Sequence, residues 1–161
     1  MKKPPENTIV KIEHNGVAFG CMGRSGSTNL LRYFKQQRID CHCLIEEFND
    51  YEGESYLILR NPLDRYKSSI NSGMGIDEFH GLPFLDKINW NNLDGIIPFE
   101  DLSKYINPKG FGWTVKTESV KHNENPITGL LDMEMVLYNM WRRKMPVLTP
   151  EKFKEITQWD T

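Results

Sequence analysis

The stretch Gly16–Phe34, GVAFGCMGRSGSTNLLRYF, decides the predicted fold. It predicts a short apolar strand, a loop of small residues with one arginine, and the start of an amphipathic helix. We call residues 23–28 the Arg24 loop. Backbone N–H groups, hydroxyls and a guanidinium meet in such a loop, which favours an anion site, most often one for phosphate. The alternative is an ordinary β–α turn. The Walker pattern is absent, because Arg24 precedes Gly26 and no Lys-Ser or Lys-Thr follows it.

Further strands are expected on both sides of this stretch. Residues 8–13 alternate, and Asn15-Gly16 is a type I′ hairpin signal that leads into residues 17–22. Residues 55–60, SYLILR, form a nearly continuous apolar run, as expected for a strand buried on both faces of a parallel sheet. Shorter strands are predicted over residues 41–48 and 95–99.

Three helices besides the one after the Arg24 loop have clear boundaries. Asn61 is a good N-cap, Pro62 suits the first helical position, and Asp64 suits the first turn, which predicts a helix over 62–71. A wide apolar stripe predicts a second helix over 130–144. A last helix is expected to begin at residues 149–151.

Strands that alternate with helices indicate an α/β fold with a mostly parallel sheet flanked by helices. In such sheets ligands bind at the carboxyl ends of the strands. Four polar clusters follow predicted strands, and we expect them at one edge of the sheet: Arg24–Thr28, Glu46-Glu47, Arg60–Ser68 and Glu100.

The composition excludes several classes of protein. Residues 1–161 are expected to form one domain, with residues 1–7 as a loose tail. A net charge of -2 gives no global footprint for nucleic acid or an anionic membrane. Three cysteines, no secretory segment and no apolar run near the ~20 residues of a membrane span indicate reduced thiols and a cytoplasmic protein. Cys41-His42-Cys43 has no second pair of suitable spacing, so no metal is expected.

Three segments, in this order, resemble the sulfotransferases that use 3′-phosphoadenosine-5′-phosphosulfate (PAPS). Residues 23–28, GRSGST, are similar to the loop that binds the 5′-phosphosulfate in that family, where some branches have Lys in place of Arg. Residues 59–68, LRNPLDRYKS, resemble the motif that binds the 3′-phosphate. Residues 97–102, IPFEDL, are similar to a strand that ends in Tyr-Glu-Asp-Leu. The resemblance covers about residues 16–106, in a chain shorter than most members.

The resemblance implies a three-layer, P-loop-NTPase-like fold and a site for PAPS and its product 3′,5′-ADP, with no metal. In the family's 3′-phosphate motif an Arg at the strand end and a Ser two helical turns later bind the phosphate; Ser69 is the alternative to Ser68 here. The residues that the resemblance assigns to nucleotide binding are Arg24, Ser25, Gly26, Ser27, Thr28, Arg60 and Ser68.

The catalytic residues implied by the resemblance are Arg24, Glu46 and Glu47. Arg24 would stabilise charge on the leaving nucleotide, and it would do so electrostatically because an arginine does not give up a proton. The family uses Glu or His as the base, and Glu46 follows the loop at about the distance where the Glu-using members keep theirs. Glu47 is adjacent, while His42 and His80 are lesser candidates.

Several alternatives stay open. An internal carboxylate such as Asp64 or Glu100 would equally satisfy a buried Arg60. The chain could be a module that binds PAPS or 3′,5′-ADP without catalysis, or a P-loop-like kinase that needs ATP and magnesium. The acceptor, expected to be a small molecule or a carbohydrate, would lie against residues 73–93 and the last helices, and a second copy of the chain could complete the site as a homodimer. Residues 109–113 faintly resemble a late phosphate loop.

Overall fold

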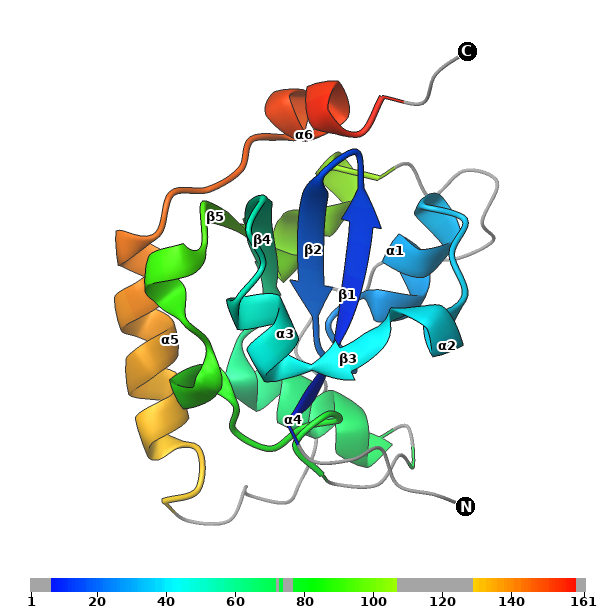
Figure 1. The fold of residues 1–161 in the computed structure, drawn as a ribbon. Helices are drawn as coiled ribbons and strands as arrows, with labels where there is room; N and C mark the ends of the chain where they lie inside the picture. Colours follow the sequence, from blue (N-terminus) through cyan, green and yellow to red (C-terminus); the bar gives the residue numbers. More distant parts are fainter. Residues whose placement is uncertain (1–6, 72, 74–76, 107–128, 159–161) are drawn as a thin grey trace.

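A five-stranded sheet with the strand order β3-β1-β2-β4-β5 lies between the helices (Figure 1). The computed structural model describes residues 7–71, 73, 77–106 and 129–158. The strands are β1 (Thr8–His14), β2 (Val17–Cys21), β3 (His42–Leu44), β4 (Glu54–Leu59) and β5 (Gly95–Pro98).

The sheet is mixed, because β1 is antiparallel to both of its neighbours while β2, β4 and β5 are parallel. The chain reverses at Asn15 and Gly16, whose φ angles of 52° and 80° are the left-handed values of a type I′ turn. The predicted hairpin is confirmed. The prediction of a mostly parallel sheet was wrong, because the hairpin and the edge strand β3 both pair antiparallel with β1. The α/β class is confirmed, whereas the P-loop-like arrangement is not.

The helices agree with most of the predicted boundaries. Asn61 caps α4 (Pro62–Asn71), since its Oδ1 accepts from the N–H groups of Leu63 at 2.9 Å and Asp64 at 3.3 Å. Thr149 caps the last helix through the Lys152 N–H at 3.1 Å. The helices are α1 (Ser27–Tyr33), α2 (Arg38–Cys41), α3 (Ile45–Asn49), α4 (Pro62–Asn71), α5 (Asp132–Lys144) and α6 (Pro150–Ile156), with 3-10 turns η1 (Leu85–Lys87), η2 (Trp90–Asn92) and η3 (Phe99–Lys104).

Two neighbouring residues of β2 show which helices cover each face of the sheet. Phe19 is fully buried, and its ring centroid lies 5.3 Å from that of Phe34 beside α1 and 5.5 Å from that of Phe153 in α6. Gly20 points the other way, where a Cβ would lie 2.6 Å from the Phe48 ring of α3. Large side chains therefore pack α1 and α6 on the Phe19 face, and the missing side chain of Gly20 lets α3 approach the opposite face.

The predicted strand over residues 41–48 was wrong at both ends. Only residues 42–44 pair with β1; Cys41 ends α2, and Glu46 and Glu47 belong to α3. Ile45 and Phe48, three residues apart, are both buried, whereas the two glutamates between them are exposed. This spacing is helical, and in so short a segment it outweighed the strand pattern.

The strand directions bring the predicted polar clusters to one edge. β3 is antiparallel to β1, and β1 is antiparallel to β2, so β2, β3, β4 and β5 all point the same way. The carboxyl end of β2 lies at the lower edge of the sheet in Figure 1, where its arrow ends, and the strand pairings direct the carboxyl ends of β3, β4 and β5 toward the same edge. The strands before the four clusters therefore end toward one edge, although Glu46 and Glu47 belong to α3; that the clusters form one site stays a prediction.

Glu134 fixes α5 to the chain before η1. Its side chain is 3% exposed, and its carboxylate accepts from the N–H groups of Phe84 at 2.7 Å and Leu85 at 3.2 Å. Burial raises the pKa of Glu134, although these two hydrogen bonds and the charge of Arg65 lower it in part.

The raised pKa of Glu134 predicts a stability that falls as the pH rises. The folded chain then binds more protons than the unfolded chain above the ordinary pKa of 4.5, so the free energy of unfolding decreases with increasing pH until the folded carboxyl has titrated. Glu134→Gln keeps one acceptor and removes the titration. We expect urea unfolding from about pH 4 to 7 to show this decrease in the wild type relative to Glu134→Gln. Parallel profiles for the two proteins would contradict the prediction.

Candidate functional site

The Arg24 loop joins the carboxyl end of β2 to α1 through two left-handed residues. The φ angle is 63° at Arg24 and 89° at Gly26. The Ser25 N–H donates to the Met22 carbonyl oxygen at 3.2 Å. A Cβ on Gly26 would lie 2.6 Å from Cδ2 of Leu102, so a larger residue would clash there. A left-handed arginine is strained, and such strain is concentrated at functional sites.

Arg60 follows β4 and reaches back to the Arg24 loop. Its Nη1 donates to the Arg24 carbonyl oxygen at 2.5 Å, and its Cζ lies 4.3 Å from the centroid of the Phe99 ring. Burial lowers the pKa of Arg60 to about 10; Asp64 opposes this shift and Arg24 adds to it. Arg60 Nε is buried without a hydrogen-bond partner among the described residues. The guanidinium is thus held against the loop with a donor that its surroundings do not satisfy.

No carboxylate in the described ranges forms an ion pair with Arg60. Glu100, one of the two carboxylates named as alternative partners of Arg60, instead pairs with Arg142 of α5 at 3.2 Å. The negative charge of Asp64 favours the charged form of Arg60. A partly buried guanidinium whose contacts, among the described residues, are a carbonyl oxygen and an aromatic ring is suited to an anionic ligand.

Ser68 connects the two predicted halves of the nucleotide site. It lies on α4, it is 7% exposed, and its Oγ accepts from Arg24 Nε at 3.0 Å. The residue predicted at the 5′-phosphosulfate and the residue predicted at the 3′-phosphate are therefore in contact. Ser69, the alternative to Ser68, is fully buried and packs against Gly81.

Arg65 joins the start of the Arg24 loop to the segment around Phe79 through hydrogen bonds. The sequence analysis assigned it no role. Its side chain is 2% exposed, and burial lowers its pKa to about 9. Nε donates to the Gly23 carbonyl oxygen at 3.0 Å, Nη2 to those of Glu78 at 2.5 Å and Phe79 at 2.6 Å, and Nη1 to that of Leu82 at 2.9 Å. Its position three residues before Ser68, on the same face of α4, was the available signal.

The segment around Phe79 packs on the start of the loop. A Cβ on Gly23 would lie 2.7 Å from the Phe79 carbonyl oxygen, so only glycine allows this approach. The Phe79 ring contacts the rings of His42, at 4.9 Å between centroids, and His80, at 5.0 Å. His80 Nδ1 is hydrogen-bonded to the Asp77 carboxylate at 3.0 and 3.1 Å. Two histidines that sequence reasoning ranked low thus contact Phe79, the residue that packs on the loop.

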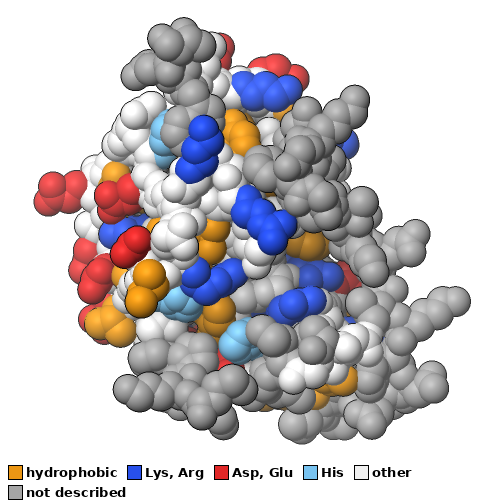
Figure 2. All heavy atoms as spheres, turned by 90° about the vertical axis from the view of Figure 1, so that its right-hand side faces the viewer, with side chains coloured by type: hydrophobic (Ala, Val, Ile, Leu, Met, Phe, Trp, Pro, Cys, Tyr) orange, Lys and Arg blue, Asp and Glu red, His pale blue; other side chains and the backbone are white. Residues whose placement is uncertain are grey.

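His42 also responds to the charges around it. Burial lowers the pKa of His42, and the positive charges of Arg38 and His80 lower it further. Figure 2 looks at the right-hand side of Figure 1. It shows Lys, Arg and His side chains gathered over the middle of that face, with Asp and Glu toward its left-hand edge. Because Arg38, Arg60 and Arg65 all contact the Arg24 loop, the surroundings of the loop are basic although the chain as a whole is not.

Glu46 and Glu47 are not brought to the loop. Both are exposed in the first turn of α3, which follows β3, and two strand spacings separate β3 from β2 in the sheet. α3 covers the Gly20 face, whereas α1 covers the opposite face. From these positions, neither glutamate contacts the Arg24 loop in the described part of the chain.

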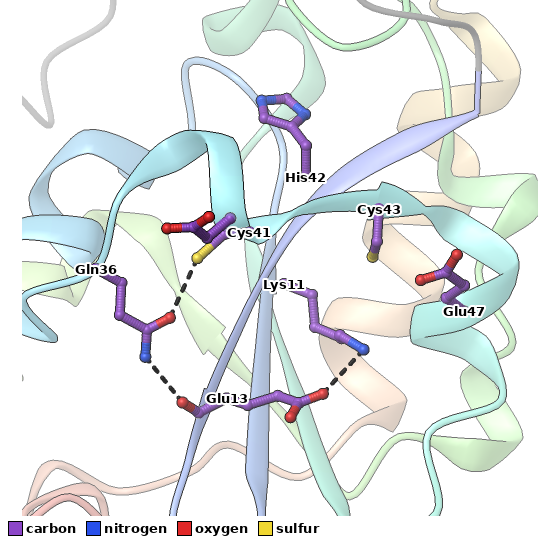
Figure 3. A pocket seen from close by; sticks show the side chains of 8 residues that line it. Lys11, Glu13, Gln36, Cys41, His42, Cys43 and Glu47 are labelled. Carbon is purple, nitrogen blue, oxygen red and sulfur yellow. Dashed lines mark hydrogen bonds and ion pairs between the residues drawn. The ribbon is translucent and has the colours of Figure 1, made fainter.

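A pocket of about 290 Å³ lies beside β3 and includes Glu47 (Figure 3). Cys43 and Glu47 point into it, while His42 points the opposite way, as alternation along β3 requires. Burial raises the pKa of Cys43 to about 11, so this thiol is protonated near neutral pH. The Cys41-His42-Cys43 sequence therefore presents its histidine and Cys43 to opposite sides.

Arg38 is a third arginine at the loop that no sequence pattern marked. It is the first residue of α2, and its Nη2 donates to Ser27 Oγ at 3.1 Å and to Thr28 Oγ1 at 2.9 Å. The reversal that returns it to the loop includes Lys35 at a φ of 56°. A left-handed lysine between two helices gives no signal in a sequence.

Some predicted parts of the site are outside the described residues. These are residues 109–113, with the suggested late phosphate loop, and residues 74–76 of the expected acceptor segment. The described rest of that segment is irregular apart from η1 and η2.

No protein-family model, curated protein or solved structure matches the chain. In the residues that the structure describes, no helix has the length and apolar character needed to cross a membrane. Nor do three His, Cys, Asp or Glu side chains meet there as a metal site. The chemistry of the site therefore rests on its own geometry: three arginines around one loop, with a histidine–aspartate pair beside them.

Proposed function

We propose that the chain is a sulfotransferase that moves a sulfuryl group from PAPS to a hydroxyl or amine acceptor and releases 3′,5′-ADP. One observation carries the proposal: the partly buried Arg60, unpaired with any described carboxylate, touches the Arg24 loop, and the loop's own arginine touches Ser68. Two anion-binding elements at the ends of adjacent parallel strands suit a ligand with two separate phosphate groups.

The described residues fit such a nucleotide. The unsatisfied Nε of Arg60 and the hydroxyl of Ser68 would hold the 3′-phosphate, and Ser25 to Thr28 would hold the 5′ end. When bound, PAPS supplies a sulfuryl group on the 5′-phosphate. Arg24 would hold charge on the leaving oxygen through its terminal nitrogens, because Nε is the atom that Ser68 engages and no other described residue binds the side chain.

The proton of the acceptor needs a base, and the geometry favours His80 over Glu46 and Glu47. The Asp77 carboxylate at Nδ1 favours the tautomer that carries its proton on that nitrogen. Nε2 then holds the lone pair that takes a proton. The whole pair is fixed next to the loop, because Arg65 ties the Glu78 and Phe79 carbonyls to that of Gly23.

Replacing His80 separates catalysis from binding. We expect His80→Asn to lower the rate of sulfuryl transfer by about 100-fold or more, since general bases typically contribute that much. The affinity for 3′,5′-ADP should stay the same. The assay uses PAPS labelled in its sulfuryl group with a panel of phenols, sugars and amines. His14→Asn, at the far end of β1, is the matched control.

A non-catalytic module that binds PAPS or 3′,5′-ADP is the second candidate. The exposed positions of Glu46 and Glu47, away from the loop, favour it over an enzyme that depends on either residue. The same assay distinguishes the two functions. Binding of 3′,5′-ADP with no transfer to any acceptor would support the module, and transfer that His80→Asn leaves unchanged would contradict the role of His80.

A further inference from the structure

Arg38 contacts the Arg24 loop at the end opposite to Arg60. Arg60 meets the loop at its second residue, through the Arg24 carbonyl oxygen. Arg38 meets it at its last two residues, through the hydroxyls of Ser27 and Thr28. The two guanidiniums therefore hold the loop between them, one from the side of β4 and the other from the side of α2.

The contacts of Arg38 leave most of its binding capacity unused. A guanidinium has five N–H donors, and the two hydroxyls are both bound by Nη2. In the part of the chain that the structure describes, no carboxylate pairs with Arg38. Two neutral acceptors do not balance its charge, so Nε and Nη1 can still engage an anion in the bidentate manner typical of arginine and phosphate.

We propose that Arg38 binds the 5′-phosphate and its sulfuryl group, and that it determines which way the nucleotide lies across the loop. This inference rests on the proposed function. Arg60 and Ser68 are grouped around Arg24 and take the 3′-phosphate, so the 5′ end lies toward Ser27, Thr28 and Arg38. That end is also the one next to His42, whose pKa the charge of Arg38 lowers. The transferable group then faces the histidines.

The alternative is that Arg38 only ties α2 to α1 through the two hydroxyls. In that role Arg38 would support the whole loop, and its loss would weaken the binding of every nucleotide alike. A ligand to the 5′-phosphate affects only nucleotides that carry this group. The two roles therefore differ in their dependence on the position of the phosphate.

Calorimetric titration of 3′,5′-ADP, 5′-AMP and 3′-AMP into the full chain tests this assignment. We expect Arg38→Ala to lower the affinity for 3′,5′-ADP and 5′-AMP by about 10- to 100-fold, which is the effect of losing one charge-assisted contact. The affinity for 3′-AMP should stay unchanged. Arg60→Ala should show the reverse preference, weakening 3′,5′-ADP and 3′-AMP only. Ligands too weak for direct titration are measured by displacement of 3′,5′-ADP at millimolar concentration.

Two further variants keep the test decisive. Arg38→Lys keeps the charge and reaches the hydroxyls, so it should restore part of the affinity for 5′-AMP if the phosphate is the partner. Arg143→Ala, an exposed arginine on α5, should change nothing. Equal weakening of 5′-AMP and 3′-AMP by Arg38→Ala, or no change in either, overturns the assignment. A wild type that does not bind 3′,5′-ADP instead overturns the proposed function itself.

Discussion

Arg60→Ala is expected to weaken binding of 3′,5′-ADP by about 100-fold without unfolding the protein. Hydrogen bonds to a charged group contribute roughly 1.5 to 3 kcal/mol, and a bidentate contact to phosphate lies at the upper end of this range. The side chain is partly buried, its pKa is lowered to about 10, and Nε has no partner among the described residues. The phosphate supplies the negative charge that this position lacks. Calorimetry on the folded variant measures the change.

The controls for Arg60 separate charge from packing. Arg60→Lys retains the charge but cannot bind bidentately, so it should bind with an intermediate affinity. Arg143→Ala removes a positive charge of the same kind from the exposed face of α5 and should leave the affinity unchanged. An Arg60→Ala variant that binds 3′,5′-ADP as tightly as the wild type would show that Arg60 has only a structural role.

Arg65→Ala is expected to have the largest effect on stability. The substitution leaves the buried carbonyl oxygens of Gly23, Glu78, Phe79 and Leu82 without the donor that joins them. An unsatisfied buried acceptor costs about 1 to 3 kcal/mol, and losing one partner of a buried charged network costs about 3 to 5 kcal/mol. For a chain of this size, this loss is roughly a 10 to 15 °C decrease in Tm.

Thermal unfolding by circular dichroism measures the effect of Arg65→Ala. Arg65→Lys should be nearly as destabilising, because a lysine cannot reach carbonyl oxygens on opposite sides of a planar fork. Arg143→Ala should unfold at the wild-type temperature. An Arg65→Ala protein within about 2 °C of the wild type would show that the four carbonyls are satisfied in another way.

The parts of the fold that depend on local chemistry were predictable from the sequence. The Asn15-Gly16 turn, the capped helix after Asn61 and the apolar run in β4 each have a cause within a few residues, and each is confirmed. The mixed sheet was missed because the direction of β3 depends on its partner strand. β3 has only three residues, and its antiparallel pairing with β1 is not encoded in its own pattern.

The predicted site residues followed a similar division. Arg24, Arg60 and Ser68 were expected from motifs at strand ends, and the structure brings these three residues together, because Arg60 contacts the Arg24 carbonyl oxygen and the Arg24 side chain contacts Ser68. Arg65 and Arg38 were missed because their roles arise from tertiary contacts with carbonyl and hydroxyl oxygens more than ten residues away or on another element. The prediction for Glu46 and Glu47 failed to bring them to the loop because it assumed a strand over a segment that folds as the helix α3.

The most direct test of the nucleotide site compares 3′,5′-ADP with its isomer 5′-ADP by calorimetry in the presence of EDTA. The two ligands have the same atoms and differ in the position of one phosphate, so the comparison isolates the site that Arg60 and Ser68 are proposed to form. We predict that the wild type prefers 3′,5′-ADP by at least about 10-fold, the effect of one phosphate contact, and that magnesium does not change this preference. Equal affinity for the two isomers, or tight binding of ATP that requires magnesium, would contradict the proposal.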